Sequence, residues 1–199
     1  KSDTAAVSLP AHLEKLWLTA SNFSNKNAPS LRQLKNLEVL DLRLTNITGI
    51  ALESVAPLEE LRYLDLRSTN VDDDSLRQLS SLKKLKWLNL DNTPISNEGL
   101  LHLRNMPNLE WLSLQWTSVT SAGLKNLVGC QRLKYLAVAQ PLTVSEEILQ
   151  PLLRLESLDY LNPMLGKESM QNLKVLIARS NSDLKLLLRP DDSHNEHWP

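Results

Sequence analysis

Residues 109–117 read LEWLSLQWT, and the spacing of their leucines, L-x-x-L-x-L, decides the fold. The same spacing begins at six positions that lie 24 residues apart: Leu13, Leu37, Leu61, Leu85, Leu109 and Leu133. The last of these units has Val138 in place of the third leucine. A spacing kept in register over six units identifies an internal repeat, and a period of this length is typical of solenoid proteins.

Each repeat predicts a strand followed by a helix. The L-x-L alternation has a period of two, which indicates a short strand. In the second half of a unit the apolar residues lie three apart, as at Leu76, Leu79 and Leu82, which indicates one buried face of a short helix. Because so short a unit cannot bury a core by itself, the units must stack. We therefore predict an α/β solenoid with a parallel sheet on its concave face and short helices on its convex face.

Four consecutive segments carry a resemblance to a known family. They are LEVLDLRLTNITGIALESVAPL (37–58), LRYLDLRSTNVDDDSLRQLSSL (61–82), LKWLNLDNTPISNEGLLHLRNMP (85–107) and LEWLSLQWTSVTSAGLKNLVGC (109–130). These segments resemble leucine-rich-repeat (LRR) proteins of the bacterial and ribonuclease-inhibitor-like varieties, and the resemblance implies a right-handed, horseshoe-shaped solenoid. The commonest family pattern has Asn where this chain has Thr45, Thr69, Thr93 and Thr117. A threonine hydroxyl can also bond the turn backbone, so the substitution affects the subclass and leaves the fold unchanged.

The repeat predicts one domain over residues 1–189 and a flexible polar tail over 190–199. We expect about eight units, of which the last two are irregular. One extra residue follows Val138, so the pattern continues one position late, and Pro163 stands where a leucine is expected. Leu184 and Leu187 indicate a final strand that closes the stack.

Composition argues against several classes of partner. The net charge is −1, the pI is near 6.5 and no basic run occurs, so we expect no nucleic-acid partner. No apolar stretch reaches about 18 residues, so we expect no membrane insertion. The single cysteine, Cys130, excludes an intrachain disulfide, and its place in the helix stripe predicts a small buried hydrophobe. This favours the cytoplasm, with a bacterial envelope or secreted location as alternatives.

The sequence carries no motif of catalysis or of cofactor binding. It lacks G-x-x-x-x-G-K, G-x-G-x-x-G, H-E-x-x-H and paired cysteines, so we expect no enzyme activity, no cofactor and no metal. His194 and His197 lack an evident third ligand, and we interpret them as part of a solvated tail. The acidic run at 72–74 precedes a helix, and we interpret it as a helix cap.

Aromatic side chains concentrate at the positions that should face away from the leucine core. The residues before, between and after the second and third leucines point to the concave face, because side chains alternate along a strand. Seven of the nine aromatics fall at these positions or at the turn residue beside them: Trp17, Tyr63, Trp87, Trp111, Trp116, Tyr135 and Tyr160. Stacking between rungs about 4.8 Å apart is one explanation, and partner binding is the other. If half of each ring stayed wet, the seven rings would expose roughly 500–900 Å², so we expect binding with stacking as its support.

Charged and small residues divide this face into two halves. The N-terminal half carries Asp41, Arg43, Asp65, Arg67 and Asp91. Asp41 can pair with Arg43 and Asp65 with Arg67 on the surface, and the alternative is that these charges contact a mixed-charge segment of a partner. In the C-terminal half, Ser113, Ala137 and Ala139 predict the floor of a shallow apolar pocket walled by Trp111, Trp116 and Tyr135. We expect Trp111→Ala to lower partner affinity with little loss of stability.

These patterns favour a non-enzymatic module that binds another protein through its aromatic concave face, as a monomer. Alternatives are the substrate-recognition arm of a larger enzyme such as a ubiquitin ligase, a glycan-binding module, and an architectural module. The stretch LVGCQRL (127–133) has a mild resemblance to F-box-linked repeats, although the chain shows no F-box-like helical segment.

Overall fold

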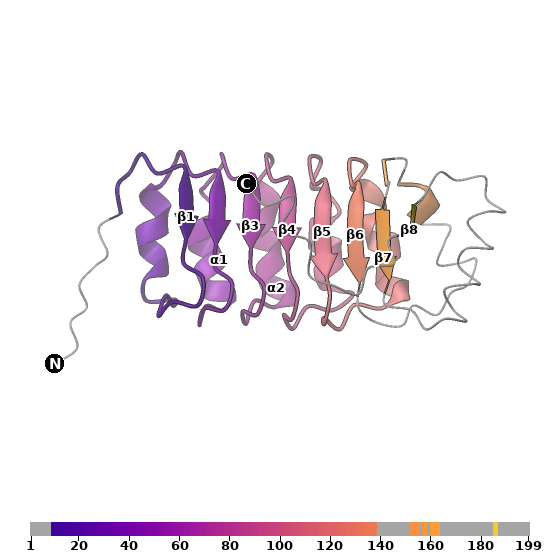
Figure 1. The fold of residues 1–199 in the computed structure, drawn as a ribbon, viewed down its shortest axis with the longest axis horizontal. Coiled ribbons are helices and arrows are strands. Elements are labelled where there is room, and N and C mark those ends of the chain that lie inside the picture. The colour runs from indigo at the N-terminus through magenta and orange to yellow at the C-terminus, as the bar shows by residue number, and fades with distance from the viewer. Residues whose placement is uncertain (1–8, 139–151, 156, 159, 164–184, 187–199) are drawn as a thin grey trace.

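The computed structural model describes residues 9–138, 152–155, 157–158, 160–163 and 185–186. Within these residues, eight parallel strands form one sheet in which they lie side by side in chain order (Figure 1). They are β1 (Lys15–Trp17), β2 (Val39–Asp41), β3 (Tyr63–Asp65), β4 (Trp87–Asn89), β5 (Trp111–Leu114), β6 (Tyr135–Val138), β7 (Tyr160–Pro163) and β8 (Lys185–Leu186). The strand order follows from the repeat, since each unit adds one strand beside the last.

The strand register repeats the spacing of the sequence. Leu16 pairs with Leu40, and each later pair joins residues 24 positions apart as far as β6. Between β6 and β7 the step grows by one residue, so Tyr135 lies opposite Tyr160. The extra residue predicted after Val138 is thereby confirmed. Strand β8 lies at the place predicted for the closing strand, whereas the tail at 190–199 and its two histidines lie outside the described residues.

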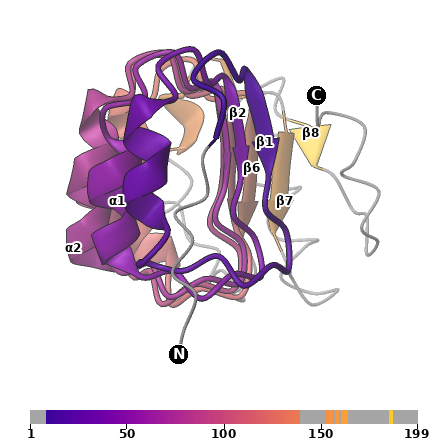
Figure 2. The same ribbon diagram turned by 90° about the vertical axis from the view of Figure 1, so that its left-hand side faces the viewer.

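Short helices cover one face of the sheet (Figure 2). They are η1 (Ala28–Gln33), α1 (Gly49–Val55), α2 (Asp73–Leu76), η2 (Arg77–Ser81), α3 (Gly99–Leu103) and η3 (Ser121–Gly129), where η marks a 3₁₀ helix. The apolar residues three positions apart suit a 3₁₀ helix, which has three residues per turn. Asp72 caps α2 by accepting from the Ser75 backbone amide at 3.1 Å, so the capping role predicted at the acidic run is confirmed there.

The leucine core lies between the sheet and the helices. Leu40, Leu64 and Leu88 are fully buried, and they pack in the same cluster as the helix leucines. At the turn after each of four strands, a threonine hydroxyl donates to the carbonyl three residues earlier, at 2.5 Å from Thr45 to Leu42 and 2.6 Å from Thr69 to Leu66. The hydroxyls therefore satisfy turn carbonyls in the buried place where the commonest repeat has Asn.

Cys130 belongs to this core. Its side chain is fully buried and its thiol donates to the Leu103 carbonyl at 3.2 Å. Burial raises the pKa of the thiol to about 12, so the thiolate is scarce at neutral pH. The prediction of a small buried hydrophobe is confirmed.

Candidate functional site

The face of the sheet opposite the helices, which we call the concave face, carries every residue that alternates with the buried leucines. One row consists of Lys15, Val39, Tyr63, Trp87, Trp111 and Tyr135, and the next of Trp17, Asp41, Asp65, Asn89, Ser113 and Ala137. The rings of Trp87, Trp111 and Tyr135 form a cluster separate from the leucine core. These three rings therefore lie on the face opposite the leucine core, while the side chain of Tyr160 lies outside what the structure describes.

Three of the predicted rings form a stack. The Trp87 and Trp111 ring centres lie 4.3 Å apart at an interplanar angle of 11°, and those of Trp111 and Tyr135 lie 5.0 Å apart at 2°. The three side chains are 6–7% exposed. The expectation that half of each ring stays wet is wrong here, because neighbouring rungs bring the ring faces into contact and leave little for water.

Of the four tryptophans within residues 9–138, two remain open to solvent. Trp17 on β1 is 50% exposed and Trp116, in the turn after β5, is 63% exposed. Tyr63 has intermediate exposure and packs against the stack, while the backbone of Tyr160 pairs opposite Tyr135. Exposed aromatic surface therefore lies at the first strand and at the turn after β5.

Trp116 has a backbone conformation that L-residues seldom adopt. Its φ is 57°, and the equivalent turn residues Ala20, Leu44, Ser68 and Asn92 have φ values of 52–57°. The repeat imposes this left-handed turn, since residues as different as alanine and asparagine share it. Asparagine is the residue that tolerates it best, whereas a bulky side chain there is strained.

Polar side chains in the second row bond the backbone of their own turn. Asp41 accepts from the Arg43 amide at 3.0 Å, Asp65 from the Arg67 amide at 2.9 Å and Asn89 from the Asp91 amide at 2.9 Å. Ser113 is too short for this bond. The carboxylate of Asp91 instead accepts from the Gln115 amide at 2.7 Å and from the Ser113 hydroxyl at 2.5 Å. Asp41, Asp65 and Asp91, which belong to the predicted charged strip, thus have structural roles. The sequence signal for Asp41, Asp65 and Asn89 is an Asp or Asn that can bond the amide two residues later, as in an Asx turn.

Arg43 contacts residues from three neighbouring rungs of the sheet. Its Nε lies 3.0 Å from Asp41 Oδ2 and 3.2 Å from the Thr19 hydroxyl, and its Nη1 lies 4.0 Å from Asp65 Oδ2. The predicted Asp41–Arg43 pair is confirmed. An Asp65–Arg67 side-chain pair does not form within 4.0 Å, because Asp65 faces Arg43 of the neighbouring rung and accepts from the backbone amide of Arg67. The Arg67 guanidinium acts on Asp65 only at longer range.

Asp65 is a buried carboxyl with a perturbed pKa. Its side chain is 2% exposed, and burial raises its pKa to about 7. The Arg67 amide opposes this rise, the negative charge of Asp41 adds to it, and the Arg67 and Arg43 guanidinium groups oppose it. The group therefore changes its charge near neutral pH.

The expected shallow pocket over β5 and β6 is not formed by these residues. Ser113 is 1% exposed and Ala137 is fully buried, so neither offers an open floor, because stacked rings fill the row beside them. Ala139 lies outside the described residues.

Ion pairs follow the edge where the strands begin, which sequence reasoning missed. Glu38 pairs with Arg62 at 3.4 Å, and Glu110 pairs with Lys86 at 3.4 Å and with Lys134 at 2.8 Å. The pKa of Glu110 is lowered, chiefly by its hydrogen bond to Lys134. The signal was present in the sequence, since each partner lies 24 residues from the next and occupies the position before its strand.

The described residues offer no metal site of the usual composition. His, Cys, Asp and Glu side chains form no group of three there that could hold a metal ion. None of the helices in the same residues combines the length and hydropathy that a membrane crossing requires.

Comparison with known proteins identifies relatives of the fold. The family model described as leucine rich repeat matches residues 11–71. An internalin (inlF) from Listeria monocytogenes is 18% identical with a TM-score of 0.53 over 88% of this chain, which spans 60% of that protein. Internalin C2 (inlC2) from the same organism is 22% identical with a TM-score of 0.58, over 87% of this chain and 80% of that one. No curated protein matches the sequence significantly. At these identities the structural likeness establishes a shared fold.

Proposed function

We propose, on the premise that this chain is a leucine-rich-repeat protein, that it is a non-enzymatic module that binds another protein through its concave face. The observation that carries the proposal is the exposure of Trp17 and Trp116, two indoles that lie on this face and at its edge. Tryptophan is a favoured anchor of protein interfaces because its large ring loses little conformational entropy on binding.

Trp116 supports the proposal most strongly because nothing in the fold requires a tryptophan at this position of the turn. The turn imposes a left-handed backbone, and Asn92 occupies the same place one rung earlier. A tryptophan there costs about 1–2 kcal/mol of backbone strain and leaves most of the ring in water. A partner that covers the ring offsets this cost.

The stacked rings have a supporting role in this proposal. Trp87, Trp111 and Tyr135 are too buried to be the main anchors, but their stack stiffens the middle of the sheet. A rigid sheet keeps the exposed anchors in place, so little entropy is lost when the partner docks.

Two double variants test which face binds. Trp17→Ala with Trp116→Ala removes the exposed concave anchors, while Ile50→Ala with Leu101→Ala removes side chains 66% and 47% exposed on the helical face. Each variant would be immobilised and exposed to lysate of the source cell, and captured proteins quantified by mass spectrometry against wild type. Circular dichroism would check that each variant is folded.

We expect the concave variant to lose a captured protein that the helical-face variant retains. The reverse pattern would reject the concave face as the binding surface. Capture of carbohydrate alone would favour a glycan-binding module, and concentration-dependent light scattering that the concave variant abolishes would favour self-assembly over a monomer.

A further inference from the structure

We infer that the N-terminal half of the concave face binds an acidic segment of a partner protein, through Lys15, Arg67 and the indole of Trp17. This inference rests on the proposed function and adds the charge class of the partner.

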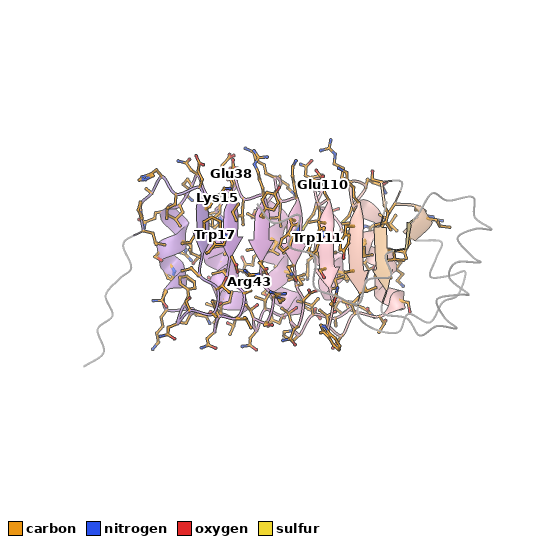
Figure 3. The ribbon with its side chains drawn as sticks, in the orientation of Figure 1. Lys15, Trp17, Glu38, Arg43, Glu110 and Trp111 are labelled. Carbon is orange, nitrogen blue, oxygen red and sulfur yellow. The ribbon has the colours of Figure 1, made fainter. Side chains whose placement is uncertain are left out.

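Two cations on this half of the face make no direct contact with an anion in the described residues, although the charge of Arg67 acts on Asp65 at longer range. Within residues 9–138 and the shorter described segments, neither the Lys15 ammonium nor the Arg67 guanidinium makes a hydrogen bond or an ion pair within 4.0 Å. Lys15 is exposed and Arg67 has intermediate exposure. Half of the Trp17 side chain is open to solvent on the same strand as Lys15 (Figure 3).

At the edge where the strands begin, charged side chains are neutralised by ion pairs with the neighbouring rung. There Glu38 faces Arg62, and Glu110 lies between two lysines, each pair joining neighbouring rungs. Figure 3 places Glu38 and Glu110 toward this edge and Arg43 toward the other end of the strands. The same 24-residue spacing brings Arg67 beside Arg43 and Asp91, yet Asp91 is engaged by Ser113 and the Gln115 amide.

Two of the three acidic residues of the half face are buried, and all three are committed to other groups. Asp41 is fully buried and holds Arg43, while Asp65 is 2% exposed and bonds the Arg67 amide. The charged groups that act on Asp65 are Asp41 on β2, Arg43 after β2 and Arg67 after its own strand. Because burial raises the pKa of Asp65 to about 7, this carboxyl is partly protonated at neutral pH and does not fully cancel the Arg67 charge. Lys15 and Arg67 therefore remain the charged side chains on the described part of this half face that are not held by a hydrogen bond or an ion pair.

The positions of the two cations suit an extended segment. Lys15 is on β1 and Arg67 follows β3, so they lie about 10 Å apart across the sheet and about 13 Å apart along the strands. The diagonal of about 16 Å corresponds to about five residues of extended chain. Trp17 lies at an intermediate level along the strands. The geometry thus fits two carboxylates about five residues apart with an apolar side chain between them.

A fluorescein-labelled oligoglutamate peptide tests the charge preference by fluorescence anisotropy. Wild type is compared with Lys15→Gln/Arg67→Gln and with Arg104→Gln/Lys125→Gln, which removes two exposed cations from the helical side and gives the same net charge. We expect Lys15→Gln/Arg67→Gln to bind about fivefold to tenfold more weakly, and the control to stay within about twofold of wild type. Added salt should weaken wild-type binding more than binding by Lys15→Gln/Arg67→Gln.

Equal affinity of wild type and Lys15→Gln/Arg67→Gln would overturn the inference, as would an equal loss in the control. A further peptide with two glutamates about five residues apart and a leucine between them tests the role of Trp17, and Trp17→Ala should remove the gain that the leucine brings. If the peptide results fail while Trp17→Ala/Trp116→Ala still loses the cellular partner, the acidic preference is wrong and the proposed function stands. If the peptides bind as expected but the cellular partner is retained by that variant, the proposed function is wrong.

Discussion

Asp65→Asn is expected to stabilise the protein above neutral pH. The buried carboxyl has a pKa of about 7 in the folded chain, against 3.8 as its ordinary value. A group whose pKa is raised on folding contributes stability below its unfolded pKa, and this contribution is lost as pH rises through the folded pKa. Ionisation of Asp65 therefore lowers the free energy of unfolding as pH rises from about 4 to about 7. Above about pH 7 the loss is complete and no longer grows with pH.

The size of the effect follows from the pKa difference. Each unit corresponds to about 1.4 kcal/mol, so between pH 5 and pH 8.5 wild type should lose about 3 kcal/mol that the variant keeps. An asparagine retains the acceptor for the Arg67 amide, as Asn89 does for the Asp91 amide at 2.9 Å on the next rung. The side-chain amide introduced by Asp65→Asn would also lie beside the Arg43 guanidinium, which is a less favourable neighbour for an amide than for a carboxylate. This lowers the free energy of unfolding of the variant by a similar amount at both pH values.

Urea denaturation followed by tryptophan fluorescence at pH 5 and pH 8.5 measures this difference. The matched reverse variant, Asn89→Asp, places an additional carboxyl on the neighbouring rung and should lose stability on going to pH 8.5. Parallel pH profiles for wild type and Asp65→Asn would refute the reasoning, because they would mean that Asp65 ionises equally in the folded and unfolded chains.

Other variants probe the stack, the turn and the core. Trp111→Ala should lower stability by about 3–5 kcal/mol in the same urea assay, contrary to the small loss expected from sequence, since the ring is buried between two others. Trp116→Asn should raise stability by about 0.5–1 kcal/mol while reducing partner capture, and a loss of stability would contradict the strain assigned to the turn. Thr93→Val should cost about 1–2 kcal/mol by leaving the Leu90 carbonyl unsatisfied, and unchanged stability would mean that the bond contributes nothing. Cys130 should react with iodoacetamide at pH 8 in urea but not in the native protein, and rapid native labelling would contradict its burial.

The sequence was sufficient to predict the fold because the same leucine pattern recurs from one repeat to the next. Periods of two and three residues predict strand and helix, and the 24-residue step aligns Leu40 with Leu64 and Leu88 without any knowledge of the chain in space. The one-residue delay after Val138 was also readable, since β6 and β7 pair with that shift.

The candidate site was only partly readable from sequence. Strand alternation gives the direction of a side chain, so the aromatic rings could be assigned to the concave face. Their exposure could not be assigned, because it depends on how the side chain of the next rung is oriented. Trp87 and Trp111 bury each other by stacking, whereas Trp17, at the end of the sheet, remains half open.

Charge pairing was decided by tertiary structure for the same reason. Arg43 can reach Asp41 on its own strand or Asp65 on the next, and the structure gives it both at 3.0 and 4.0 Å. The spacing of residues along a strand determines which face they share. The distance to the neighbouring rung, the side-chain rotamers and the exclusion of water determine which of them pair, stack or remain available to a partner.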